Sequence, residues 1–282
     1  MDYNDVDLDC SSPETISPSR VIGHMSEARM LAVEREEKIL SYLAQYGRGS
    51  VPELSRELAV SEATLRRDLR RLSTRYPVRR VYGGAVLESI AGLEAPIFQR
   101  CGLHAEEKQR IGRAAAALVS DGETVILVGG STTLQVVAHL ADKRDITVIT
   151  DSILIAEKAA EQADTTVILL GGIVRRTELA LEGYLTQLCL KELRANKVFM
   201  GARAANLSQG LMLDEVSEVT LFRDCAQAAT EIILVADHSK FGQVATAVLG
   251  PLGMVHCIVT DSALPGEYLA KLRDLGFEVV LA

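Results

Sequence analysis

The sequence contains no hydrophobic run long enough to cross a membrane, because a helical span needs roughly 18 or more consecutive apolar residues. Its first ten residues, MDYNDVDLDC, are acidic, whereas a signal peptide starts with basic residues. We therefore predict a cytoplasmic protein with no membrane segment. Apolar residues make up 48% of the 282 residues, which is enough for two packed units, one small and one of ordinary domain size.

The sequence also lacks the usual signatures of metal, disulfide and nucleophilic sites. The five cysteines lie far apart without a CxxC pair, and the five histidines show no ligand spacing. Motifs such as HExxH, GxSxG and the Walker-type GxxxxGK[ST] are absent. We therefore predict reduced thiols and neither a metal, a cofactor nor a catalytic residue. Only His238 lies near a candidate site, and we expect it to be structural.

A formal net charge of −8 argues against nucleic-acid binding, since contacts to phosphates depend on Lys and Arg. The distribution of the charge changes this argument. Between residues 61 and 83 the sequence has seven arginines and two acidic residues, a local net charge of +5. The acidic surplus therefore lies in other parts of the chain.

Three helical patterns and a hairpin pattern surround this basic segment. Residues 34–47 have helical apolar spacing and end at a glycine, and a short helix with Pro52 in its first turn follows. Ser61 is a favourable N-cap for a third helix, and the pair Gly83-Gly84 suits a hairpin turn. Three helices followed by a hairpin predict a winged helix-turn-helix.

The third helix has apolar residues on one side and arginines on the others. A recognition helix lies in the major groove, where the fork of an arginine can pair with both acceptors of guanine. An arginine-rich helix can also be a merely solvated surface, but the surrounding pattern favours DNA reading. The residues that we expect to contact DNA are Ser50, Ser61, Glu62, Ala63, Thr64, Arg66, Arg67 and Arg70 in the helices, and Arg79 and Arg80 in the wing.

Farther along the chain, apolar β-rich runs alternate with helical patterns. Seven such runs, among them TVILV, ITVIT and CIVTD, are apolar on both faces, which is typical of a mainly parallel sheet covered by helices. We therefore predict an α/β protein with a winged helix-turn-helix and a larger, mainly parallel α/β sensor domain. The predicted units are a disordered tail (1–30), the DNA-binding domain (31–88), a linker (89–105) and the effector-sensing and oligomerisation domain (106–282).

Small polar residues follow several of these strands. Ligands of open α/β sheets bind beyond the carboxyl ends of the strands, where helix N-termini and backbone amides attract anions. The sequence GGSTT either holds a phosphate or is a glycine turn with an ordinary N-cap, and the neighbouring strand ends favour the phosphate. The residues that we expect to bind an effector are Gly130, Ser131, Thr132, Thr133, Thr150, Asp151, Ser152, Gly171, Gly172, Arg175, Glu218, Asp237 and Lys240.

These segments together resemble the DeoR family of regulators. The resemblance rests on Arg35, Ile39 and Leu43, on residues 61–69, on the wing RRVYGGAV, and on the segments GGSTT and ADHSKFG. It implies a sensor domain similar in fold to ribose-5-phosphate isomerase, a sugar-phosphate effector and a double-stranded DNA operator. The sequence departs from the family pattern at Phe222, where a lysine is common, and in the strand before GGSTT, which lacks a frequent acidic or polar residue.

The resemblance implies a repressor of a carbohydrate-utilisation operon whose operator binding is modulated by a sugar phosphate. Two alternatives are a sugar-phosphate isomerase-like enzyme, with Asp151 or Asp237 as general base and Lys240 as electrostatic stabiliser, and a module that recruits partner proteins without sensing a metabolite. A basic winged helix has no use in an isomerase, so we favour the regulator. Two symmetric half-sites predict a homo-oligomer, either a dimer or a tetramer.

Overall fold

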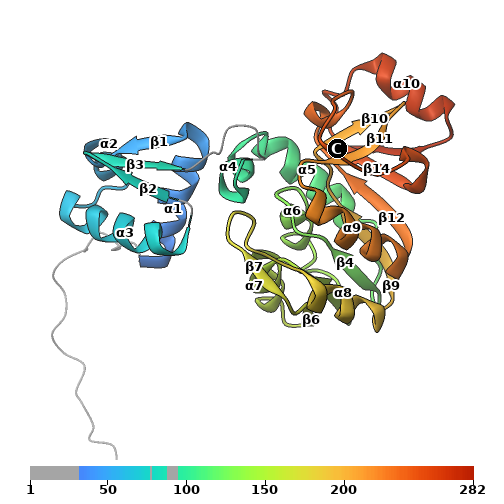
Figure 1. The fold of residues 1–282 in the computed structure, drawn as a ribbon, viewed down its shortest axis with the longest axis horizontal. Helices are drawn as coiled ribbons and strands as arrows, with labels where there is room; N and C mark the ends of the chain where they lie inside the picture. Colours follow the sequence, from blue (N-terminus) through green and yellow to red (C-terminus); the bar gives the residue numbers. More distant parts are fainter. Residues whose placement is uncertain (1–31, 77, 88–94) are drawn as a thin grey trace, which may run out of the picture. The chain divides into compact units, whose positions relative to one another are not determined.

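A computed structural model describes residues 32–76, 78–87 and 95–282 (Figure 1). The tail predicted at 1–30 lies outside the described residues, as do residues 88–94 at the start of the predicted linker. The later part of that linker contains a helix, α4 (Ile97–Gly102), which buried Ile97 anchors. No helix among the described residues is long and apolar enough to span a membrane.

The N-terminal domain is a winged helix-turn-helix, as predicted. Its elements are α1 (Ala32–Tyr46), β1 (Arg48–Ser50), α2 (Val51–Glu57), α3 (Glu62–Arg75), β2 (Val78–Val81) and β3 (Gly84–Leu87). The strands form an antiparallel sheet in the order β1-β3-β2. Strand β1 was not expected from the sequence. It pairs closely with Gly84, where a side-chain Cβ would lie 2.4 Å from the carbonyl oxygen of Gly49, so only glycine fits.

Capping residues set the ends of these helices. Helix α1 ends before Gly47, whose φ of +71° is the left-handed conformation that favours glycine. The Ser50 hydroxyl accepts a hydrogen bond from the Glu53 amide while the Glu53 carboxylate accepts one from the Ser50 amide, a complete capping box. At α3, the Ser61 side chain accepts from the Thr64 amide at 3.2 Å. Local sequence therefore determines where the helices begin and end.

A buried ion pair fastens α1 to α3. Asp68 is 2% exposed, and its two carboxylate oxygens accept from Nε and Nη2 of Arg35 at 2.6 and 3.2 Å. Arg71 also contacts this carboxylate at 3.3 Å. Leu65 and Leu69, on the same inward side of α3 as Asp68, face the domain core. Arg66, Arg67 and Arg70, which Asp68 does not bind, remain on the outer surface.

The second domain extends over residues 95–282. In addition to α4, its helices and strands are α5 (Ala105–Ala116), β4 (Thr124–Leu127), α6 (Thr133–Val137), β5 (Ile146–Thr150), α7 (Ile153–Ala160), β6 (Thr165–Leu169), β7 (Ile173–Arg175), β8 (Ala180–Glu182), α8 (Tyr184–Lys191), β9 (Ala195–Met200), β10 (Ala204–Asn206), β11 (Gly210–Leu213), α9 (Val216–Ala228), β12 (Ala229–Val235), η1 (His238–Lys240), β13 (Ala247–Gly250), η2 (Leu252–Met254), β14 (Cys257–Thr260), α10 (Gly266–Asp274) and β15 (Glu278–Leu281).

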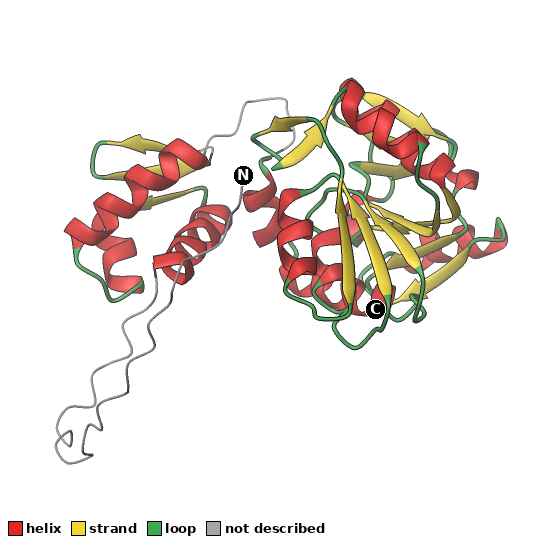
Figure 2. Ribbon diagram, turned by 90° about the horizontal axis from the view of Figure 1, so that it is seen from below, coloured by secondary structure: helices red, strands yellow, loops and turns green. Residues whose placement is uncertain are grey.

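A seven-stranded parallel sheet forms the centre of this domain, and its strands are the seven apolar runs of the sequence. Helices cover both of its faces (Figure 2). One core packs α5, α6 and α7 against the sheet, and the other packs α8, α9 and α10. Two small antiparallel sheets, β10-β11-β13 and β7-β8, were not expected from the sequence. The predicted mainly parallel α/β architecture is confirmed.

The strand order is β15-β14-β12-β9-β4-β5-β6. Starting at β4, the chain adds β5 and β6 on one side and then returns to the other side of β4 to add β9, β12, β14 and β15. The direction of winding therefore reverses between β4 and β9. Beyond the carboxyl ends of two such strands the connections diverge and leave a crevice, which is where open α/β sheets bind ligands.

We predict that Asp68→Ala destabilises the winged helix by roughly 3–5 kcal/mol, because it leaves the guanidinium of Arg35 buried without its partner. Glu62→Ala removes a solvent-exposed pair with Arg66 and should cost at most about 1 kcal/mol. Hydrogen exchange of α1 and α3 peptides in the full chain measures both effects. Equal protection of the two variants would contradict a structural role for the buried pair.

Candidate functional site

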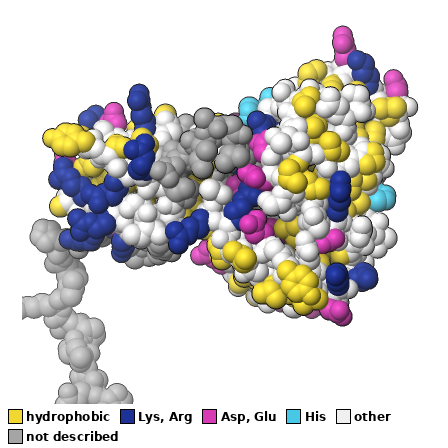
Figure 3. All heavy atoms as spheres, in the orientation of Figure 1, with side chains coloured by type: hydrophobic (Ala, Val, Ile, Leu, Met, Phe, Trp, Pro, Cys, Tyr) yellow, Lys and Arg dark blue, Asp and Glu magenta, His cyan; other side chains and the backbone are white. Residues whose placement is uncertain are grey.

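The outer face of α3 is strongly basic. Arg66, Arg67 and Arg70 are exposed, and Figure 3 shows Lys and Arg side chains gathered over this helix. Nη2 of Arg66 lies 2.7 Å from a carboxylate oxygen of Glu62 one turn earlier, which holds the guanidinium over the first turn. Exposed Ala63 leaves space beside it. This face meets the requirements of a helix that reads base edges.

Hydroxyl groups and the wing flank this face. The hydroxyls of Ser61 and Thr64 lie 2.9 Å apart at the start of α3, and Ser50 caps α2. Arg79 and Arg80 are exposed on β2, the first strand of the wing. The side chain of Arg75 is outside the described residues. All the residues predicted to contact DNA therefore lie at helix starts, on the exposed face of α3 or on the wing.

A first cavity lies at the crevice between β4 and β9. Four predicted residues line it after β4, namely Gly130, Ser131, Thr132 and Thr133. The ends of β9 and β12 complete its wall with residues 201–203 and 235–236. Arg203 and Lys240 bring two cationic side chains to the same space. Polar groups from three strand ends thus converge on one volume.

The GGSTT loop is held by its own hydrogen bonds. The Gly129 amide donates to the Asp151 carboxylate at 2.8 Å, and the Thr133 hydroxyl donates to the carbonyl of Val128 at 2.7 Å. Among the described residues no hydrogen bond uses the amides of Ser131 or Thr132. The loop is therefore fixed in shape while retaining backbone donors beside the cavity, the arrangement that suits an anion.

A second cavity adjoins the first beyond β4 and β5. Arg175 lies in its wall and forms an ion pair with Glu218 at 2.8 Å, with Glu178 at 3.8 Å from the same guanidinium. Glu178 also pairs with Arg100. The charge of Arg175, expected to bind a phosphate, is thus already balanced by two carboxylates. Phe222 is buried and contributes an apolar surface to both cavities.

Asp151 is fully buried at the floor of the second cavity. Desolvation raises its pKa to about 6, against the opposing effects of hydrogen bonds from the amides of Gly129 and of Asp151 itself and of the charge of Arg175. The carboxylate is therefore the ionised form at neutral pH, but at a cost in stability. Buried carboxylates of this kind are characteristic of binding sites.

A third cavity has a cationic wall made of Arg100, Lys108, Arg203 and Lys240, with Asp237 between them. Burial lowers the pKa of Lys108 to about 8. Sequence reasoning missed three of these cations. Arg203 lies three residues after the end of β9, so its place just beyond a predicted strand could have indicated it as a cavity residue. Arg100 and Lys108 reach the cavity from α4 and α5, and the rule that ligands bind beyond the carboxyl ends of strands does not point to helix residues.

Four predicted residues have structural contacts and do not line these three cavities. The Thr150 hydroxyl donates to the carbonyl of Leu127, and Ser152 caps α7. The carbonyl of Gly171 accepts from the Thr186 hydroxyl, and a Cβ on Gly172 would lie 2.3 Å from that hydroxyl oxygen. These residues shape the strand ends around the cavities without facing them.

Comparison with known proteins identifies both domains. Residues 35–91 match the DeoR-like helix-turn-helix domain, and residues 103–262 match the DeoR C terminal sensor domain. The chain belongs to the DeoR family. This DeoR-family regulator is therefore a helix-turn-helix transcription regulator with a C-terminal sensor domain, and its predicted family is confirmed.

Two curated relatives cover nearly the whole regulator. It is 32% identical to the HTH-type transcriptional regulator GolR of Listeria innocua, over 90% of this chain and 100% of that protein. It is 30% identical to the glycerol-3-phosphate regulon repressor of Escherichia coli, over 87% of this chain and 97% of the relative. Among solved structures, ribose 5-phosphate isomerase A of Methanocaldococcus jannaschii aligns with a TM-score of 0.37 and 18% identity, over 49% of this chain and 55% of the isomerase.

We predict that Asp151→Asn stabilises the sensor domain at pH 7.5, by up to roughly 3 kcal/mol. The pKa of Asp151 is about 6 in the folded protein, against an ordinary value of 3.8 for aspartate, so between these pH values the folded state binds more protons than the unfolded state. The free energy of unfolding of the wild type therefore falls as the pH rises from about 4 to about 6. Asparagine does not ionise, so the variant avoids this loss.

Urea unfolding at pH 7.5 and pH 4 measures this effect, and the advantage of the variant should disappear at the lower pH. Asp164→Asn, at an exposed position, is the matched control and should behave as wild type at both pH values. A variant that is less stable than wild type at pH 7.5 would show that the Asp151 carboxylate stabilises the fold.

Proposed function

We propose that this regulator represses a carbohydrate-utilisation operon and releases its operator when a sugar phosphate enters the sensor domain. The observation that carries the proposal is the cavity at the β4–β9 crevice, where the GGSTT loop faces Arg203 and Lys240. Anions bind where backbone amides and cations converge. The name of the glycerol-3-phosphate regulon repressor, a relative over most of the chain, supports a phosphorylated polyol as the effector class.

In the proposed DNA complex, α3 enters the major groove. Arg66, Arg67 and Arg70 reach base edges, and Glu62 orients Arg66 through their ion pair. Ala63 allows close approach to the bases. Arg79 and Arg80 of the wing, together with the hydroxyls of the helix starts, contact phosphates and set the position of the domain on the duplex.

In the proposed effector complex, Ser131 and Thr132 donate to the phosphate from the GGSTT loop while Lys240 balances its charge. Asp151 and Glu218, at the second cavity, accept hydrogen bonds from the hydroxyls of the polyol. Phe222 separates these polar regions and packs against the carbon chain. The phosphate and hydroxyl ends of the ligand thus occupy adjoining cavities.

We further propose that the regulator is a homo-oligomer, a dimer or a tetramer, because helix-turn-helix domains read two symmetric half-sites. An apolar patch on the sensor domain supports self-association. Ile173 and Val174 of β7 and Tyr184, Leu185 and Leu188 of α8 are exposed, and Figure 3 shows hydrophobic side chains gathered over this part of the domain. Effector binding then changes the arrangement of the subunits, and by reciprocity DNA changes the affinity for the effector.

We predict that Arg66→Ala costs about 1–3 kcal/mol of discrimination at one base pair of the operator, because a bidentate contact to guanine is lost. The operator is first selected from random DNA, and anisotropy titrations then compare it with single-base variants. Arg113→Ala, an exposed arginine on α5, is the control and should leave discrimination unchanged. An equal loss of affinity on every DNA sequence would demote Arg66 to a phosphate contact.

We predict that Lys240→Ala abolishes the response to the effector and leaves operator binding intact. A thermal-shift screen of sugar phosphates, beginning with glycerol 3-phosphate, identifies the ligand that stabilises the wild type and releases it from DNA. Lys271→Ala, an exposed lysine on α10, should respond as wild type. Stabilisation by none of the sugar phosphates would favour a regulator that recruits partners without sensing a metabolite.

A further inference from the structure

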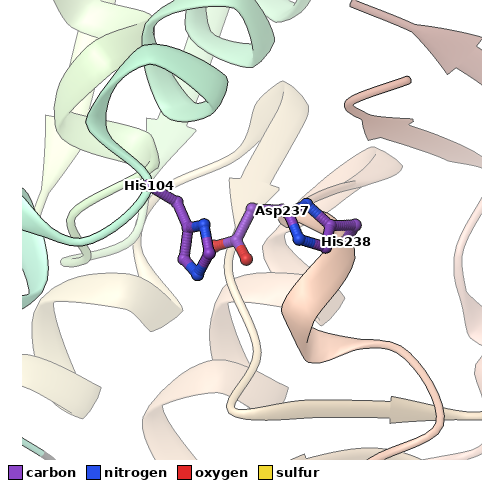
Figure 4. Close-up of side chains that lie close together, drawn as sticks. All are labelled: His104, Asp237 and His238. Atoms are coloured by element: carbon purple, nitrogen blue, oxygen red, sulfur yellow. The ribbon is translucent and has the colours of Figure 1, made fainter. Parts of the chain in front are cut away.

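Three potential metal ligands meet beside the third cavity, although the sequence motifs predicted no metal. His104 immediately precedes α5, Asp237 is the N-cap of η1, and His238 is the first residue of η1. One ligand atom from each of the three lies within 4.8 Å of the others. In Figure 4 the His104 ring and the Asp237 carboxylate point toward each other from separate segments, with the His238 ring beside them.

Asp237 carries an unsatisfied oxygen into this group. The residue is fully buried, and its Oδ1 accepts hydrogen bonds from both the amide and the hydroxyl of Ser239. Its Oδ2 has no hydrogen-bond partner among the described residues. A buried carboxylate oxygen without a partner is unfavourable, and a bound ion is one arrangement that satisfies it.

His238 is prepared to act as a ligand. Its Nδ1 lies 2.9 Å from Oδ1 of Asp261, a fully buried residue that also accepts from the His238 and Ala263 amides. A carboxylate that accepts from one ring nitrogen fixes the tautomer and leaves Nε2 as the free lone pair. This is the usual outer contact of metal-bound histidines.

His104 supplies a ligand that can move. Its side chain is exposed, and its ring meets the His238 ring edge to face with 5.0 Å between centroids. A tetrahedral zinc ion with bonds of about 2.1 Å holds its ligand atoms roughly 3.4 Å apart. Rotation of the exposed His104 side chain can therefore close the group around an ion.

We propose that His104, Asp237 and His238 form a binding site for a divalent transition-metal ion, with Zn²⁺ as the best match. Two imidazoles and one carboxylate suit Zn²⁺, whereas Mg²⁺ and Ca²⁺ require mostly oxygen ligands. The positive charges of Lys108 and Lys240 nearby further disfavour ions that bind by charge alone. Three protein ligands leave a position open toward the third cavity, where water or a ligand oxygen completes the coordination.

Asp237 was expected from the sequence to bind the effector, but the test of this metal site needs neither DNA nor a sugar phosphate. Untagged full-length protein, freed of metal with a chelator, is titrated with ZnCl₂ in a calorimeter. We expect one Zn²⁺ per chain. His104→Ala and Asp237→Asn should each weaken binding at least about tenfold, and Asp261→Asn, through His238, about 10–100-fold.

His256→Asn provides the matched control, because this exposed histidine lies outside the group and the asparagine oxygen can replace Nδ1 as acceptor for the Ile232 amide. It should bind Zn²⁺ as wild type does, and circular dichroism checks that every variant is folded. A wild type that binds no Zn²⁺, or a His104→Ala protein that binds it with unchanged affinity, overturns the proposal. Either result leaves the effector proposal standing, since that is decided by the sugar-phosphate screen.

Discussion

The pairing of β4 with β9 is the constraint on which the sensor domain depends. Because β4 pairs with β5 on one side and β9 on the other, the connections that follow β4 and β9 diverge. The GGSTT loop, the end of β9 and the end of β12 all border the space between them, together with Glu218 and Phe222 of α9. Fully buried residues such as Val198 and Phe199 hold this register, and through it they position every group of the cavity.

Burial and charge oppose each other throughout this region. Asp151 and Asp237 lie completely buried at the carboxyl edge of the sheet, where ionised carboxylates destabilise the fold unless they find partners. Arg175 is balanced by Glu178 and Glu218, and Arg203 on the cavity wall pairs with Asp214 at 2.9 Å. Such unfavourable placements are expected where a protein retains a binding site at the expense of stability.

In the winged helix, too, some charged residues are paired inside the domain while others remain exposed. Asp68 and Arg35 neutralise each other between α1 and α3, while the leucines of α3 fill the core. Arg66, Arg67 and Arg70 on the outer face of α3 are left exposed. An acidic protein can in this way present a basic surface, because a few fixed contacts decide which charges are consumed internally.

Local signals in the sequence predicted most of the fold. Ser61 and Gly47 mark helix ends, the seven apolar runs became the seven parallel strands, and GGSTT identified one wall of the cavity. These features depend on near neighbours in the chain, so their physical causes can be read from a linear pattern. The short antiparallel strands β1, β7 and β8 were missed, because each exists only through its pairing with a partner.

Tertiary structure alone decided which distant side chains meet. Arg100 and Lys108 reach the cationic wall from helices before the first strand, and His104 lies beside His238 although 133 residues separate them in the sequence. Neither of these contacts can be read from residue spacing in the sequence, because both result from the strand order and the packing of helices, which helical or strand periodicity does not specify. The linear pattern was therefore enough for the family, the winged helix-turn-helix and the parallel sheet, whereas the packing of the sheet decided the charge balance of the cavity and the histidine–aspartate group beside it.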